Sequence, residues 1–200
     1  VATDAAGNTA SCSFTVTVTD EESPEIVCQD DVAITTSNLG TNGDCAGQYA
    51  WDHPEPTDNC SVVNYTVTYT NPDGTIDGPY NVYATSAPTG LSGGAAPANR
   101  HFELGVTTVI YTVEDAAGHV VTCDFTVTVT DDEVPTFVNC PEGVTFTVGL
   151  FSDDCQGGAI WSVPIADDNC SVTVTQTAGP LQGEILAVGT YPIQYTATDA

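Results

Sequence analysis

Basic residues are almost absent from this chain. Its 200 residues hold 27 Asp and Glu against a single Lys or Arg, which is Arg100, so the formal net charge is −26 at pH 7. Nucleic acids and anionic membrane surfaces would repel such a surface, which excludes both as partners. Yet 41% of the residues are hydrophobic, too many for a disordered acidic tail. We therefore expect a folded, soluble protein.

Methionine is missing as well, and no apolar run reaches the roughly 18 residues that a membrane span requires. The first absence indicates a processed or excised piece whose secretion signal is gone, and the second excludes membrane insertion. Eight cysteines at repeating positions favour an oxidising compartment. These features together predict an extracellular protein, either secreted or on the cell surface.

The common motifs of enzymes are also lacking. There is no nucleophile elbow, phosphate-binding loop or paired metal-binding motif, and only three histidines are present. One of them, His119, stands in a DAAGH turn where the other copy of the same motif has Asn8, so it is interpreted as a turn residue. We expect no catalytic activity.

What the sequence has instead is a repeat. Residues 1–28 and 112–140 share a DAAG turn, a cysteine and the string FTVTVTD, and the pattern begins a third time at 196–200. The first residues thus belong to the end of one unit, and the last residues to a unit without its final strand. The predicted division is 1–22, the closing strand of a preceding unit that is donated to a neighbour; 23–131, a complete sandwich with an insertion near 71–103; and 132–200, a second sandwich lacking its last strand.

Apolar and polar residues alternate in several short segments, as in half-buried β-strands. Turn residues separate the segments, and no helical periodicity occurs. Regularly spaced short strands of this kind predict an all-β fold of tandem antiparallel sandwiches. The segments expected as strands are 13–20, 64–70, 107–113, 124–131, 143–148 and 171–177.

Several motifs recur in order along the chain: WDHPEPTDNCS at 51–61, WSVPIADDNCS at 161–171, VATDAAGNTASCSFTVTV at 1–18 and NCPEG at 139–143. In these motifs the chain resembles the hyalin repeat (HYR) family over nearly its whole length. The resemblance implies immunoglobulin-like sandwiches used in extracellular adhesion and structural arrays rather than in catalysis. The chain departs from the family pattern in having Gln29, not Pro, after Cys28, and in the insertion.

The cysteines occupy four positions in each unit. A zinc site is disfavoured because CxxC pairs are missing, so disulfides are expected. The complete unit holds the first to fourth positions at Cys28, Cys45, Cys60 and Cys123; the second unit holds the first three at Cys140, Cys155 and Cys170; and Cys12 is the fourth position of the preceding unit.

Four cysteines allow three pairings, and the sequence alone does not choose among them. Short separation favours the pairs Cys28–Cys45 and Cys140–Cys155, which leaves Cys60 for Cys123. Cys170 is then expected to bond Cys12 of the next copy.

Carboxylates gather at the junctions between units, and hard oxygen ligands of this kind suit Ca²⁺. The alternative is that they are solvated acidic turns. The candidate ligands are Asp20, Glu22, Asp58, Asp131, Glu133 and Asp168. Three N-x-S/T sequons are candidate glycosylation sites, Asn59, Asn64 and Asn169, although the DNCS motif also serves a turn.

The two incomplete ends complement each other. The strand around Thr9, Phe14, Val16 and Val18 would expose its apolar face without a sheet, and the last sandwich would present an open edge. The main hypothesis is a structural subunit of an extracellular filament or surface array, assembled head-to-tail from copies of itself; an equal alternative is a window of a longer tandem polypeptide. A different hypothesis is an adhesion or carbohydrate-binding spacer that uses Tyr80, Tyr83 and Phe102 of the insertion.

Overall fold

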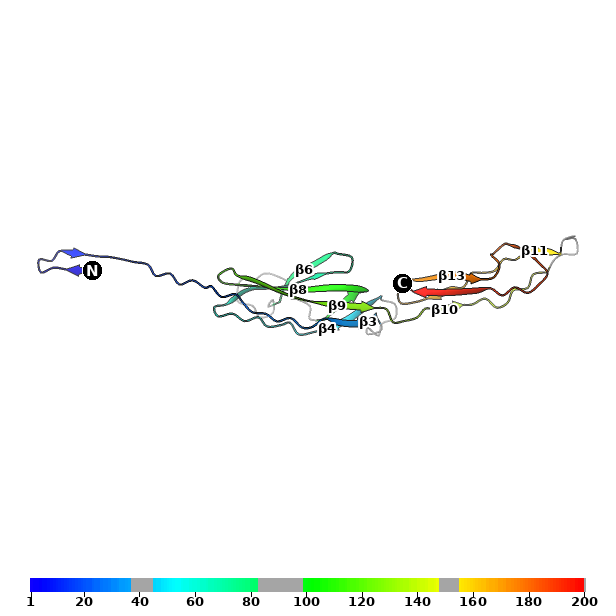
Figure 1. Cartoon of the computed structure of the whole chain (residues 1–200), viewed down its shortest axis with the longest axis horizontal. Helices are drawn as coiled ribbons and strands as arrows, with labels where there is room; N and C mark the ends of the chain where they lie inside the picture. The colour runs from blue at the N-terminus through cyan, green and yellow to red at the C-terminus, as the bar shows by residue number, and fades with distance from the viewer. Residues whose placement is uncertain (37–44, 83–98, 148–154, 200) are drawn as a thin grey trace.

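A computed structural model describes residues 1–36, 45–82, 99–147 and 155–199 of the chain (Figure 1). The ordered elements in these ranges are strands, and none is an α-helix. In chain order they are β1 (Ala2–Thr3), β2 (Thr9–Ala10), β3 (Val32–Thr35), β4 (Ala46–Ala50), β5 (Val62–Thr70), β6 (Ile76–Asn81), β7 (Asn99–Glu103), β8 (Gly105–Asp115), β9 (Val120–Thr130), β10 (Thr136–Asn139), β11 (Gln156–Gly158), β12 (Ile165–Asp167), β13 (Val172–Ala178), β14 (Ile185–Ala187) and β15 (Gln194–Asp199). The predicted all-β class of tandem immunoglobulin-like sandwiches is confirmed.

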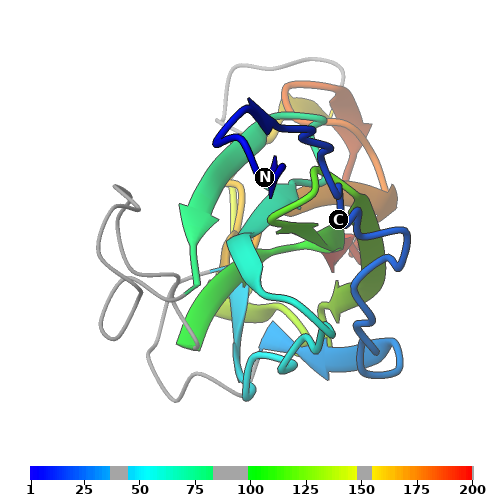
Figure 2. The same cartoon turned by 90° about the vertical axis from the view of Figure 1, so that its left-hand side faces the viewer.

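The first sandwich is built on a five-stranded sheet with the order β3-β9-β8-β5-β6. Its pairs are antiparallel except for the outer pair, in which β3 runs parallel to β9. A second sheet of β4 and β7 covers one face of it (Figure 2). The last strand of this sandwich, β9, therefore lies inside the sheet, between its first strand β3 and β8.

Alternation of side chains explains why these segments are strands. In β9 the residues Phe125, Val127 and Val129 are buried, and the threonines between them are less so. Strands β5 and β8 show the same period of two, so three neighbouring strands present one continuous apolar face. Each side chain that is removed from water in this way stabilises the fold by about 2 kcal/mol.

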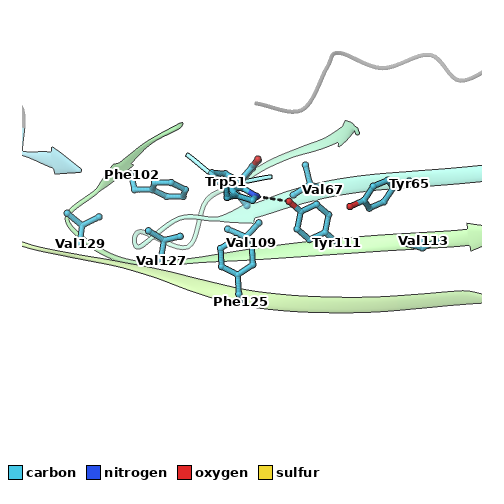
Figure 3. Packing of buried hydrophobic residues seen from close by; sticks show 11 residues of the cluster. Trp51, Tyr65, Val67, Phe102, Val109, Tyr111, Val113, Phe125, Val127 and Val129 are labelled. Atoms are coloured by element: carbon cyan, nitrogen blue, oxygen red, sulfur yellow. Dashed lines mark hydrogen bonds between the residues drawn. The ribbon is translucent and has the colours of Figure 1, made fainter. Parts of the chain in front are cut away.

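Trp51 lies at the centre of the core (Figure 3). Its indole ring contacts Tyr69, Phe102 and Phe125, which come from both sheets. Its Nε1 donates a hydrogen bond of 2.8 Å to the hydroxyl of Tyr111, so the polar atom of the ring is satisfied inside the core. Burial raises the pKa of Tyr111 to about 12, which keeps this hydroxyl protonated.

The second sandwich repeats this arrangement in a less complete form. Its described strands make three two-stranded sheets, β10-β12, β11-β14 and β13-β15. Trp161 Nε1 donates a 2.8 Å hydrogen bond to the hydroxyl of Tyr195, the equivalent of the Trp51 pair. However, Pro164 is the only buried residue among those described after residue 131. The second sandwich thus contains the Trp–Tyr hydrogen bond, but the described residues do not enclose a core around it.

Two predicted strands are not strands in the structure. Residues 13–20 run extended without a partner, and the described part of 143–148 has no strand either. In the first sandwich the equivalents of these two segments are β9 and β3, which pair with each other. Each segment lacks the neighbour that its counterpart has, and a strand needs interstrand hydrogen bonds to form. The other four predicted strands are confirmed as β5, β8, β9 and β13.

The cysteine pairing also differs from the expectation. The structure contains the disulfides Cys28–Cys123 and Cys45–Cys170. The expected pairs Cys28–Cys45, Cys140–Cys155 and Cys60–Cys123, and the bond from Cys170 to Cys12 of another copy, were therefore wrong. Separation in sequence was a poor guide because the parallel contact of β3 with β9 brings the start and end of the sandwich together, while Cys45 and Cys170 lie where the two sandwiches meet. The remaining thiols, all exposed, are those of Cys12, Cys60, Cys140 and Cys155.

Candidate functional site

Residues 11–19 form an extended segment that is exposed along its whole length (the exposed segment; dark blue in Figure 1). It repeats the sequence of β9, so Phe14 corresponds to Phe125. Yet Phe14 is 87% exposed, whereas Phe125 is 2% exposed. Val16 and Val18 are exposed in the same way, although their equivalents in β9 are buried. The segment thus carries the apolar face of a core strand with nothing packed against it.

Thr9, the first residue of the predicted interacting strand, is placed differently. It lies in β2, opposite Thr3 of β1. The turn of this hairpin is closed by Asp4, whose carboxylate accepts hydrogen bonds from the backbone N–H groups of Ala6 and Asn8. The unpaired part of the strand therefore begins after Ala10.

The second sandwich has an open edge at β15. In the first sandwich β8 pairs with both β5 and β9. Its equivalent β15 pairs with β13 alone among the described strands. Apolar residues of this sandwich, such as Val144 and Phe146, are about half exposed. In the first sandwich the corresponding place beside β8 is taken by β9, whose sequence pattern the exposed segment repeats.

Acidic groups gather where residues 20–22 meet the turn at 58–61. Asp58 Oδ2 accepts hydrogen bonds of 2.9 Å from the backbone N–H groups of Cys60 and Ser61, and Glu22 accepts one from the Asn59 amide. The Cys60 thiol faces Asp20, whose pKa is lowered first by the Glu22 N–H and then by this thiol. Two buried carboxylate oxygens, Asp20 Oδ2 and Asp58 Oδ1, accept no hydrogen bond of ordinary geometry.

The same arrangement recurs between the two sandwiches. Asp131 Oδ1 accepts hydrogen bonds from the Thr36 hydroxyl and the Glu133 backbone, and Asp168 Oδ1 accepts one from the Cys170 backbone. The other oxygen of each carboxylate is buried without a partner, as is Asn169 Oδ1. The predicted ligands Asp131 and Asp168 are therefore brought together, whereas Glu133 contributes a backbone contact.

Comparison with known proteins agrees with the repeat structure. A model described as "HYR domain" matches residues 89–129. The protein Hyalin of Strongylocentrotus purpuratus is 30% identical over 98% of this chain, and Hyalin of Lytechinus variegatus is 29% identical over the same share. The chain belongs to the hyalin repeat (HYR) family. It spans 14% and 32% of the lengths of these two relatives.

No solved structure matches this HYR chain. Family membership characterises it as a repeat module, and its two disulfides fit an extracellular setting. None of the described residues forms a helix that is long and apolar enough to cross a bilayer.

The chemistry of the HYR junctions suits a hard cation. Carboxylate and amide oxygens are the ligands that Ca²⁺ prefers, and each junction offers at least two that no protein donor satisfies. Oxygens of Asp131 and Asp168 lie within 4.8 Å of each other and of Cys170 Sγ. Because Cys170 is bonded to Cys45, its sulfur is not a thiolate ligand. The donor set is therefore made of oxygens.

Sequence reasoning missed Asp115 and His119 at the first HYR junction. Their side chains lie with that of Asp20 inside a 4.8 Å cluster. Burial raises the pKa of Asp115, but the hydrogen bonds from His119 and from the turn outweigh it and leave the pKa lowered. The DAAGH motif was the available signal, since it places an acid and a base four residues apart.

The predicted glycosylation sites and the insertion give a mixed result. Asn59 is exposed, while Asn64 lies inside β5 and Asn169 is half-buried, and glycosylation of all three stays a prediction. Of the proposed contact surface, Tyr83 falls outside the described residues and Phe102 is buried in the core. Tyr80 donates a hydrogen bond to Asp77, which also pairs with Arg100. Tyr80 and Phe102 thus make contacts within the fold.

Proposed function

We propose that this chain is a structural module of an extracellular filament or surface array, in which sandwiches are completed by strands of adjacent units. The exposed segment of one unit would enter the open edge of β15 in another, either in a neighbouring copy or in the same polypeptide. Main-chain hydrogen bonds and the alternating side chains of the segment would then restore the arrangement seen around β9. A contact of this kind is head-to-tail and does not close on itself, so it propagates.

A single observation carries the proposal: the same sequence is buried as β9 and exposed at 11–19. Phe14, Val16 and Val18 would each contribute about 2 kcal/mol on burial, as their equivalents do in the first sandwich. The disulfide pattern supports the same placement, because Cys28 bonds Cys123 through the β3–β9 contact. A strand that took the place of β9 in the second sandwich would set Cys12 beside Cys140.

The test is the assembly state of the purified chain, measured by light scattering and negative-stain microscopy after oxidation with glutathione disulfide. We expect end-to-end assemblies that contain a Cys12–Cys140 bond between copies. Phe14→Asp should abolish assembly without unfolding the chain, since Phe14 is already exposed. Val27→Asp is the matched control, because Val27 is equally apolar and 82% exposed but lies outside the segment. Monomers from the unaltered chain, or assembly insensitive to Phe14→Asp, would contradict the proposal.

We also propose that Ca²⁺ stiffens the junctions by binding the unpaired carboxylate oxygens. The melting temperature should then rise on addition of Ca²⁺ and fall with EDTA, because a ligand that binds only the folded state stabilises it. Asp168→Asn keeps an oxygen for the Cys170 backbone N–H but removes the charge, so it should reduce the shift. Asp124→Asn, on the exposed side of β9, changes the net charge equally and should leave the shift intact. No shift in the unaltered chain would exclude the site.

A further inference from the structure

The two disulfides follow two different rules of the repeat. Cys28 and Cys123 are the first and fourth cysteines of one unit, so their bond closes that unit. Cys45 is the second cysteine of the same unit, and Cys170 is the third cysteine of the next. The second bond therefore joins adjacent sandwiches, across 125 residues of sequence.

Applied to the four exposed thiols, the same rules give every one of them a partner position. Cys12 is a fourth cysteine and Cys140 a first, which are the two positions that close a unit. Cys60 is a third cysteine, so its partner position is the second cysteine of the unit before it. Cys155 is a second cysteine, so its partner position is the third cysteine of the unit after it.

The local structure around these thiols matches that of the bonded pair. Both Cys60 and Cys170 follow an Asp-Asn pair, and the backbone N–H of each donates a 2.9 Å hydrogen bond to the Asp. Cys45 directly precedes β4, and Cys155 directly precedes the short strand β11. Each free thiol thus lies in the setting in which its bonded equivalent meets a neighbouring sandwich.

Charge around the thiol is also alike at the two junctions. Asp131 lies close to Cys170, and its equivalent Asp20 lies close to Cys60. The bonded junction and the junction with a free thiol thus carry the same acidic group beside the cysteine sulfur.

We propose that Cys60 and Cys155 form disulfides between successive units of this repeat, so that Cys155 of one copy bonds Cys60 of the next. The partner is a second copy of this chain, whose Cys155 or Cys60 occupies the position that Cys45 or Cys170 occupies here. In forming the bond the two thiols lose two electrons and two protons. An external disulfide such as glutathione disulfide accepts them and becomes two thiols. The inference uses the head-to-tail order of the proposed function but not the insertion of a strand.

The experiment uses the full chain with Cys12→Ser and Cys140→Ser, which removes the two other free thiols. Cys60→Ser is added to one batch and Cys155→Ser to a second, leaving a single reactive cysteine in each. After oxidation with glutathione disulfide, intact mass is measured without reductant. We expect the mixture to form a Cys155–Cys60 heterodimer about tenfold in excess of either homodimer, because only complementary surfaces raise the local thiol concentration.

Peptide mapping supplies the control for folding, since Cys28–Cys123 and Cys45–Cys170 should persist in every variant. Heterodimers no more abundant than random pairing gives would overturn the inference, as would a Cys12–Cys60 bond within the unaltered chain. If the unaltered chain forms the Cys60–Cys155 bond between copies but no Cys12–Cys140 bond, only the proposed strand insertion is contradicted. If it forms the Cys12–Cys140 bond but no Cys60–Cys155 bond, only the present inference is contradicted.

Discussion

His119 Nδ1 lies 2.7 Å from Asp115 Oδ2, inside the turn that joins β8 to β9. The Asp115 side chain is fully buried, and its other oxygen accepts the backbone N–H groups of Ala117, Gly118 and His119. The hydrogen bond to Asp115 raises the pKa of His119, and desolvation opposes it only in part. The turn therefore favours the protonated form of the histidine.

This pair makes the stability of the first sandwich depend on pH. Because the folded pKa of His119 is raised, its contribution is complete below the unfolded value of about 6.5 and is lost as the pH rises through the folded value. We expect the melting temperature, measured from pH 5 to 9, to fall through this window. His119→Asn reproduces the chain's own Asp4–Asn8 pair, in which the amide donates a 2.8 Å hydrogen bond. If the melting temperature of His119→Asn falls by the same amount over this pH range, other groups cause the pH dependence.

Tyr111→Phe should destabilise the first sandwich by about 1–3 kcal/mol. The hydroxyl accepts from Trp51 and lies 2.6 Å from His53 Nδ1, so its removal leaves buried polar atoms without a partner. Urea unfolding followed by Trp fluorescence measures the loss. Tyr195→Phe is the matched variant, and its cost should be smaller because Trp161 is only half-buried and water replaces the lost acceptor. Equal losses of stability in the two variants would show that burial of the Trp–Tyr pair does not determine the cost of removing the hydroxyl.

The two disulfides should have different effects when removed. Replacing Cys28 and Cys123 by serine opens a loop with a sequence separation of 95, and chain entropy predicts a loss of about 4–5 kcal/mol. Replacing Cys45 and Cys170 by serine should change the free energy of unfolding little, because the loop that their bond closes already contains a folded sandwich. It should instead broaden the interdomain distance distribution in small-angle X-ray scattering. An unchanged distribution would mean that other contacts fix the junction.

Val127→Thr and Val16→Thr make the same change at equivalent positions. Val127 is fully buried in β9, so a hydroxyl without a partner should cost about 1–3 kcal/mol there. Val16 is exposed, and the substitution should leave the melting temperature of the isolated chain unchanged. Chemical denaturation of both variants tests this. Destabilisation by Val16→Thr in monomeric chain would show that the exposed segment already packs against something.

The sequence was a good guide wherever local pattern decides structure. Alternation identified β5, β8, β9 and β13, and the repeat identified the family and the all-β class. It failed at 13–20 and 143–148 for a physical reason. Strand propensity is realised only with a neighbour, and each of these two segments lacks the neighbour that β9 or β3 provides in the first sandwich.

The disulfides show a second limit. Pairing depends on which strands are adjacent, and a parallel contact between the first and last strands of a sandwich has no local signal in the sequence. The bond between Cys45 and Cys170 was even harder to predict from the sequence, because it depends on how two sandwiches contact each other. At the junctions, the candidate acidic residues could be found from composition, but Asp115 could not, since its position depends on being buried within a turn.

The interior position of β9 has a consequence for synthesis. Within the first sandwich this strand is made last, and it lies between β3, which is made first, and β8. The sheet cannot grow outward strand by strand as the chain leaves the ribosome, because the place beside β3 stays empty until the eleven residues of β9 emerge. The sheet is then completed in a single late step, in which β9 pairs with the distant strand β3. Topologies with such long-range contacts fold slowly. A nascent chain that stalls before Thr130 would present an unfinished sheet to chaperones.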